Sequence, residues 1–277
     1  MREATTIIRA NGLGASARRI AAMIRRYAFL IVGSGPRMLE LMYWPLVQMV
    51  MWGFLQTHLA ASTSLFANAA GLLIGSVLLW DILLRVQFGF SLSFLEEMWS
   101  RNLGNILMSP LKPNEYIAAL MVISFVRLLI GLVPVIVLAY LFFDFNLFGL
   151  GLPLAAFVAN LIFFGWMIGL TANGVVIRYG MGAESFTWVA VFFFLPLCCV
   201  YYPLATLPGW LQPVSAALPP THVFEGLRAL MSEGVFRADL MLKAFALNVL
   251  YFTGAYVLFR YFLRQARIKG SLMQIGE

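Results

Sequence analysis

Apolar residues gather in long runs along the chain, and shorter polar segments separate these runs. We predict that six of the runs cross a membrane as helices, because a helix needs about 20 apolar residues to span the hydrocarbon layer. The predicted spans are residues 39–59, 69–90, 116–143, 154–176, 186–204 and 244–263. The runs are continuous and lack the alternation of a membrane β-barrel. The sequence therefore predicts an all-α polytopic membrane protein with six transmembrane helices.

Residues 15–30, before the first predicted span, have an amphipathic pattern. Apolar residues at helical spacing, from Ile20 to Leu30, fall on one side, and a cluster of arginines falls on the other. These arginines are Arg18, Arg19, Arg25 and Arg26. A helix with one basic and one apolar side is typical of the membrane interface. We predict an N-terminal amphipathic interfacial helix that ends at the Gly-Ser-Gly-Pro segment of residues 33–36.

Two connections are longer and more polar than the others. Residues 91–115 mix charged and amide side chains with Leu and Met, which predicts a cytoplasmic helix-turn-helix between spans 2 and 3. Residues 205–243 contain prolines and two apolar-faced segments that are too short to cross. Irregular backbone at membrane depth has to be covered by protein. We therefore predict outer re-entrant or surface helices between spans 5 and 6.

Composition and charge set the orientation. Of the 277 residues, 62% are hydrophobic and 11% are charged, against about 25% charged in soluble domains. Fourteen basic residues fall in segments assigned to the cytoplasm and three in segments assigned to the outside. The fourteen are Arg2, Arg9, Arg18, Arg19, Arg25, Arg26, Arg37, Arg101, Lys112, Arg178, Arg260, Arg264, Arg267 and Lys269, and the three are Arg228, Arg237 and Lys243. The positive-inside rule then places both termini in the cytoplasm.

The same distribution suggests how the chain is divided and what it contacts. We expect a cytoplasmic N-terminus with the interfacial helix at residues 1–37, a single transmembrane domain at residues 38–263 and a cytoplasmic basic tail at residues 264–277. The net charge of +7 lies beside the apolar spans, which indicates contact with lipid phosphates and no nucleic acid.

Three charged residues fall inside predicted spans. Asp81 and Arg85 lie one helical turn apart in the second span, and Arg127 lies in the third. Charges in a bilayer are costly and usually face a partner or a polar cavity. These residues fit a structural ion pair, a polar element near a transport path, or the ion relay of a secondary transporter. The sequence leaves all three interpretations open.

The sequence lacks the patterns of an enzyme. A phosphate-binding loop for ATP ends in Gly-Lys-Ser or Gly-Lys-Thr, whereas every lysine here follows a leucine or an isoleucine. No nucleophile with a base and no metal-ligand pattern occurs, so we expect no catalytic residue, metal or cofactor in this chain. Cys198 and Cys199 are adjacent within an apolar run, and we expect them to be packing residues.

Two stretches resemble the ABC-2 family of exporter permeases, which have the type V exporter architecture. The first is Glu-Met-Trp-Ser-Arg-Asn-Leu-Gly at residues 97–104, followed by Ser-Pro-Leu at residues 109–111 and by Glu115. The second is Leu-Pro-Pro-Thr-His-Val-Phe-Glu-Gly-Leu-Arg at residues 218–228. In this family, two six-span subunits work with two cytoplasmic ATPase subunits.

The resemblance implies a role for each segment. The first stretch is similar to the coupling helix that the ATPase grips, which implies ATPase contacts at Glu96, Glu97, Arg101, Asn102, Gly104, Ser109, Pro110 and Glu115. The arginine-rich helix would transmit the stroke of the ATPase. The second stretch would cap the outer exit through Pro219, Pro220, Thr221, His222, Glu225 and Arg228.

The resemblance implies a permease subunit of the bacterial inner membrane. It would form a homodimer and bind two copies of a cytoplasmic ABC ATPase, which holds the ATP and magnesium. The pair would move an amphipathic or lipid-linked substrate outward. The alternatives are a secondary transporter that uses Asp81, Arg85 and Arg127, and a membrane scaffold that transports nothing.

Overall fold

The computed structural model describes residues 12–62 and 64–269 of the chain. Within these ranges the regular structure is helical, without a strand. The helices are α2 (Leu13–Val32), α3 (Gly35–Ser62), α4 (Ser64–Trp99), α5 (Leu103–Met108), α6 (Pro113–Phe143), α7 (Leu152–Tyr179), α8 (Glu184–Phe194), α9 (Gln212–Ala216), α10 (Pro219–Glu233) and α11 (Ala238–Lys269), with 3-10 turns η1 (Leu147–Leu150), η2 (Met181–Ala183) and η3 (Leu204–Thr206). The predicted all-α class is confirmed for this part. Arg2, Arg9 and residues 270–277 of the predicted tail lie outside the described residues.

Five helices of the described chain are long and apolar enough to cross a membrane. Their spanning parts are Gly35–His58, Gly71–Trp99, Pro113–Phe143, Leu152–Tyr179 and Ala238–Ile268. They correspond to the first four predicted spans and to the last one, which begins earlier than the sequence suggested. The chain is therefore a multi-pass membrane protein.

The fifth predicted span, residues 186–204, is not one continuous helix. Helix α8 ends at Phe194, and the chain then turns through residues 195–202, where Cys199 has a φ of 53°. Pro196 contributes to the break, because proline has no N–H and so cannot donate the next helical hydrogen bond to the Phe192 carbonyl, which instead accepts from the Leu195 N–H at 3.2 Å. The described chain thus has five helices of spanning length where the sequence predicted six.

Helix α4 forms the centre of the bundle. It packs against α3, α6, α7, α8 and α10. In its most apolar stretch, 72% of the residues are buried, against 17% in α3 and 22% in α11. A helix that is apolar all round has to be covered by protein or lipid. Helix α4 is therefore the core helix, whereas α3 and α11 keep apolar sides for lipid or for another subunit.

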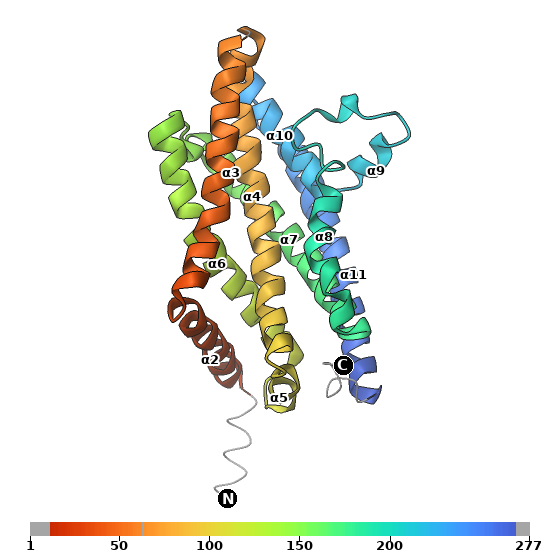
Figure 1. Cartoon of the computed structure of the whole chain (residues 1–277). Coiled ribbons are helices and arrows are strands. Elements are labelled where there is room, and N and C mark those ends of the chain that lie inside the picture. Colours follow the sequence, from red (N-terminus) through yellow and green to blue (C-terminus); the bar gives the residue numbers. More distant parts are fainter. Residues whose placement is uncertain (1–11, 63, 270–277) are drawn as a thin grey trace, which may run out of the picture.

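The long helices run side by side, and Figure 1 shows which segments meet at each end. Helices α2 and α5, the starts of α3, α6 and α8, and the ends of α4, α7 and α11 lie at one end, which we call the basal end. Helix α9 and the ends of α3 and α10 lie toward the opposite, distal end. Among the described residues, all arginines and lysines belong to basal segments except Arg85, Arg127, Arg228, Arg237 and Lys243.

Candidate functional site

Helix α2 lies at the basal end and packs mainly against α6 (Figure 1). Tyr27 and Ile31 are buried on its inner side, whereas Phe29 and Val32 are exposed on the other. The predicted amphipathic helix is therefore present over Leu13–Val32. Its place in a membrane interface remains a prediction.

The arginines of α2 do not form one exposed face. Arg19 and Arg26 are seven residues apart, so they share a side of the helix, and both form ion pairs with acids of other helices. Arg18 and Arg25 have the same spacing and are exposed. The four arginines were predicted to form one basic side, although the spacing of seven residues already indicated two separate pairs.

Arg19 joins α2 to the start of α6 through Glu115. Its guanidinium donates two hydrogen bonds to the Glu115 carboxylate, at 2.8 and 2.6 Å, and the Ser16 hydroxyl donates a third at 2.7 Å. The backbone N–H of Lys112 also donates to Glu115, at 2.9 Å, which caps the first turn of α6. Glu115 is 5% exposed. One buried carboxylate thus fixes the beginning of α6 and anchors α2.

Arg26 joins α2 to the end of α4 through Glu97. The guanidinium donates to both carboxylate oxygens of Glu97, one of them at 3.0 Å. The Asn102 side-chain amide donates to the same carboxylate at 2.8 Å. Glu97 is only 1% exposed, so these partners replace the water that a carboxylate otherwise requires. Glu97 therefore ties α2, the end of α4 and the residue before α5 together.

The environment fixes the charge states of these α2 residues. The hydrogen bonds from Arg19 to Glu115 and from Arg26 to Glu97 raise the pKa of each guanidinium above its ordinary value. Burial raises the pKa of Tyr27, whose hydroxyl lies 3.5 Å from the Tyr116 hydroxyl. Arg19 and Arg26 thus stay charged and Tyr27 stays neutral at physiological pH.

The corner between α4 and α5 has a tightly defined backbone. Arg101 adopts a φ of 54°, and the Asn102 N–H donates to the Glu97 carbonyl at 2.9 Å. A residue in the left-handed region commonly ends a helix in this way, although a side chain there costs about 1 kcal/mol or more. Gly104 is half-buried in α5, and Ser109 closes its end by donating to the Ile106 carbonyl at 2.6 Å.

Arg127 does not join Asp81 and Arg85, as the sequence analysis allowed. Its guanidinium donates to both oxygens of Glu96, at 3.0 and 2.9 Å, and Arg37 approaches the same carboxylate at 4.0 Å. The reason lies in helix direction, because side chains tilt toward the N-terminus of their own helix. Helix α6 begins at the basal end, so Arg127 extends basally toward Glu96 and away from Asp81.

Asp81 and Arg85 do form the expected pair within α4. Arg85 donates to the two carboxylate oxygens at 2.5 and 3.2 Å, and its third hydrogen bond goes to the Leu41 carbonyl of α3 at 2.8 Å. A Cβ on Gly131 of α6 would lie 2.2 Å from the Arg85 Nη1 atom. The glycine therefore makes room for the guanidinium, and the pair links α3, α4 and α6.

We call residues 96–115 the coupling segment. The residues of this segment that another protein could contact differ from those predicted from the sequence. Glu96, Glu97 and Glu115 turn inward to arginines of this chain. This geometry argues against the direct docking contacts that the sequence analysis assigned to them. The exposed residues of the segment are Trp99, Ser100, Arg101, Asn105, Met108, Ser109, Pro110, Lys112 and Asn114. Trp99 and Met108, which are 49% and 71% exposed, were not among the residues predicted to contact an ATPase.

The second predicted stretch packs on the turn that interrupts the fifth predicted span. The Leu197 carbonyl accepts from the hydroxyls of Ser215 and Thr221, at 2.5 and 3.4 Å. The Cys199 carbonyl accepts from Arg228 at 2.6 Å. Backbone groups freed by a broken helix need such partners within a membrane protein. The side chains around α10 therefore make the break in this span tolerable.

Most of the predicted outer residues are engaged at this turn. Pro219 and Pro220 are buried at the start of α10. Glu225 accepts from the Leu204 N–H at 2.7 Å and pairs with Arg228 at 3.0 Å. The His222 Nε2 atom lies 2.8 Å from the Ala216 carbonyl. The structure thus brings these residues together, and their role as a cap of the exit remains a prediction.

The fold defines a helical, multi-pass membrane protein with a buried ionic network at one end. A family model described as ABC-2 type transporter matches residues 34–232, which is more than two thirds of the chain. The chain therefore belongs to the ABC-2 type transporter family, and the resemblance drawn from its sequence is confirmed. The matched domain is a permease domain and does not include a nucleotide-binding module. No curated protein matches the chain.

Proposed function

We propose that this chain is the permease subunit of an ATP-binding cassette exporter. Two copies enclose a transport path, and two ATPase subunits bind at the basal end, which faces the cytoplasm of a bacterial cell. Membership of the family supports the permease class. The sequence lacks a phosphate-binding loop, so ATP and magnesium belong to the partner chains.

The proposed cargo is an amphipathic or lipid-linked molecule that leaves the cytoplasm or the inner leaflet. Support comes from the apolar surface of α8, where Trp188, Phe192 and Phe193 are 39%, 50% and 65% exposed. An aromatic surface of this kind favours the apolar part of an amphiphile. Exposed aromatic side chains also suit contact with lipid, so cargo assays with the complete transporter have to decide the substrate.

One observation carries the proposed mechanism: ion pairs join α2 to both helices that flank α5. Arg26 reaches the end of α4 through Glu97, and Arg19 reaches the start of α6 through Glu115. A protein that docks on the exposed side of α5 would displace these two helix ends together, and α2 would follow. Buried, hydrogen-bonded acids suit this transmission because they hold one geometry.

The alternative of a secondary transporter has less support. Its proposed ion relay needs Asp81, Arg85 and Arg127 in sequence, but Arg127 pairs with Glu96 instead. The remaining pair of Asp81 and Arg85 is closed on itself and on a backbone carbonyl. The scaffold alternative predicts that charge reversal in the coupling segment is tolerated, which the next experiment tests.

We expect Arg101→Glu to weaken assembly with the partner ABC ATPase, and to lower hydrolysis by the purified complex at least about fivefold. Arg101 is exposed at the corner before α5, and a reversed charge there makes a complementary interface repulsive. Arg178→Glu is the matched control, because Arg178 is exposed at the basal end but lies outside the coupling segment. Equal losses in both variants, or none in Arg101→Glu, would contradict docking at this segment.

The two ends of the bundle should react with a membrane-impermeant thiol reagent from opposite sides. In spheroplasts, we expect Trp210→Cys, just before α9, to be labelled directly, and Ser109→Cys, after α5, to be labelled only after permeabilisation. Trp210 is 76% exposed, whereas the native Cys198 and Cys199 are buried and should not compete. Labelling of both new cysteines from one side would show that residues 184–204 do not complete a sixth crossing.

A further inference from the structure

A pocket of about 410 Å³ lies between the end of α11 and the start of α6. It is lined by Pro113, Arg260, Tyr261, Leu263, Arg264 and Arg267. The pocket is at the basal end. Pro113 is the one residue of the coupling segment that lines it. Arg264 and Arg267 belong to the predicted basic tail, and α11 continues through them as a helix to Lys269.

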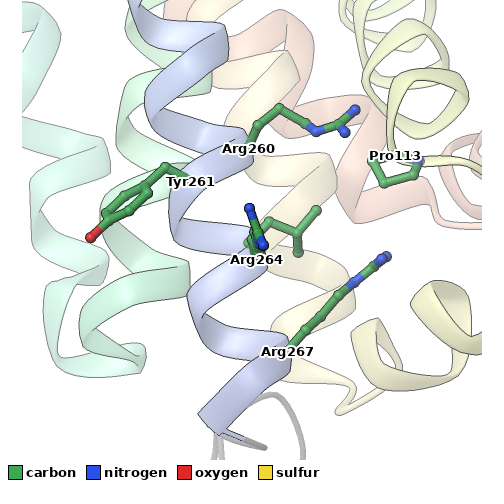
Figure 2. Close-up of a pocket in the computed structure, with 6 residues that line it drawn as sticks. Pro113, Arg260, Tyr261, Arg264 and Arg267 are labelled. Atoms are coloured by element: carbon green, nitrogen blue, oxygen red, sulfur yellow. The ribbon is translucent and has the colours of Figure 1, made fainter.

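The three arginines of the pocket share one side of α11. Arg260, Arg264 and Arg267 are separated by four and three residues, which places them on one helical face. Figure 2 shows Arg260 and Arg267 extending from α11 toward Pro113, with Arg264 between them, while Tyr261 points to the other side of the helix. The arginines thus concentrate positive charge in one concave region.

Arg260 is positioned by neighbouring polar groups. Its guanidinium donates to the Asn114 Oδ1 atom at 2.7 Å and to the Tyr256 hydroxyl at 3.3 Å. Within the described chain, no carboxylate forms a salt bridge with Arg264 or Arg267. The nearest acid in sequence to Pro113, Glu115, is already occupied by Arg19. The positive charge of the pocket therefore lacks an acidic partner in this part of the protein.

The position of the pocket along α11 indicates the kind of molecule that it would hold. The spanning part of α11 ends at Ile268, and Val257, which lies one turn before Arg260 on the same side of the helix, is 60% exposed. An apolar surface therefore continues directly into the basic pocket. A ligand with a phosphate head and an apolar body fits both parts, because guanidinium groups bind phosphate oxygens in pairs.

We propose that this pocket binds the phosphate group of an anionic amphiphile at the basal membrane interface. Basic pockets between membrane helices are typical sites for lipid head groups. An acidic protein surface is a weaker match, because it would leave the adjoining apolar side chains of α11 uncovered. The inference rests on the geometry of α11 and α6 and does not depend on the proposed transport function.

Lipid binding by the purified full-length chain in a neutral detergent tests the proposal. Phosphatidylglycerol and phosphatidylcholine with identical acyl chains serve as probes, and native mass spectrometry gives the Kd of each. We expect Arg264→Gln/Arg267→Gln to weaken phosphatidylglycerol binding at least about tenfold. Arg18→Gln/Arg25→Gln is the matched control, since it removes the same charge from exposed basal positions, and we expect less than about a twofold change.

Two further experiments identify the source of the phosphate and distinguish a lost site from a folding defect. Competition by soluble glycerol phosphate would support a site for the phosphate group alone, and lack of competition would support a site that also needs the acyl chains. Arg264→Lys/Arg267→Lys keeps the charge and should retain more binding than the glutamine variant. Equal losses in the pocket and control variants, or equal Kd values for the two lipids, would overturn the proposal.

Discussion

Asp81→Leu is expected to lower the free energy of unfolding by about 3 kcal/mol or more, because it leaves a buried guanidinium without its counter-charge. The side chains of Arg85 and Asp81 are only 11% and 9% exposed. Once Asp81 is gone, the Leu41 carbonyl is the one remaining hydrogen-bond partner that the described structure gives to Arg85. Denaturation by SDS in mixed micelles measures the loss.

The free energy of unfolding of the double variant Asp81→Leu/Arg85→Leu should be within about 1 kcal/mol of that of the unmodified protein, because replacing a whole buried ion pair by apolar residues is often nearly neutral. The free energy of unfolding of Arg85→Lys should fall between those of Asp81→Leu and the double variant, since a lysine keeps the charge but cannot donate in the forked geometry of the guanidinium. A double variant as unstable as Asp81→Leu alone would show that the pair contributes more than mutual neutralisation.

The same double variant separates a structural pair from an ion relay. If the pair is structural, the folded double variant should keep ATP-dependent activity in the complete transporter. If Asp81 carries ions or protons, the folded double variant should be inactive, because the carboxylate that would carry them is gone. Activity measured beside the stability assay therefore decides between the two interpretations.

Arg26→Glu is expected to uncouple the ATPase from the permease, with at least about a tenfold loss of transport that is linked to hydrolysis. The substitution places a second carboxylate against the buried Glu97 and replaces the anchor between α2 and α4 by repulsion. We expect the free energy of unfolding to fall by about 2 kcal/mol, less than for Asp81→Leu, because Arg26 is 39% exposed and water screens part of the repulsion.

The reversed pair Arg26→Glu/Glu97→Arg should restore part of the coupling and of the stability. Restoration is expected to be incomplete, because Asn102 donates to Glu97 and cannot donate to an arginine in the same way. Arg25→Glu is the matched control, being the adjacent, exposed arginine of the same helix. A swapped variant no better than Arg26→Glu, or an equal loss in Arg25→Glu, would contradict a specific role for the Arg26–Glu97 pair.

Local patterns gave the elements of this protein. The length of the apolar runs identified the first four spans and the last one, because burial of a helix in lipid depends on the apolar content of that segment alone. Helical spacing identified the amphipathic helix that became α2. The pair of Asp81 and Arg85 could also be read directly, since four residues on one helix are neighbours whatever surrounds them.

The break in the fifth predicted span could not be predicted from local sequence patterns. Pro196 and Pro203 were visible in the apolar run, but prolines are tolerated in membrane helices when neighbours satisfy the freed backbone. Whether the run stays helical therefore depended on what faces it. Here Ser215, Thr221 and Arg228 supply the hydrogen bonds, and the chain turns after Phe194.

The partners of the charged residues were decided by the tertiary structure. Arg127 and Glu96 are 31 positions apart, Arg26 and Glu97 are 71 apart, and Arg19 and Glu115 are 96 apart. Each pairing depends on the direction and rotation of two helices, which composition and spacing within one segment do not specify. The sequence alone thus determined that this is a helical, multi-pass membrane protein with basic and acidic residues near one end. Only the packing of α2 against α6 and the end of α4, and of α6 against α4, turned those acids inward, because a buried carboxylate must find its counter-charge where the helices meet.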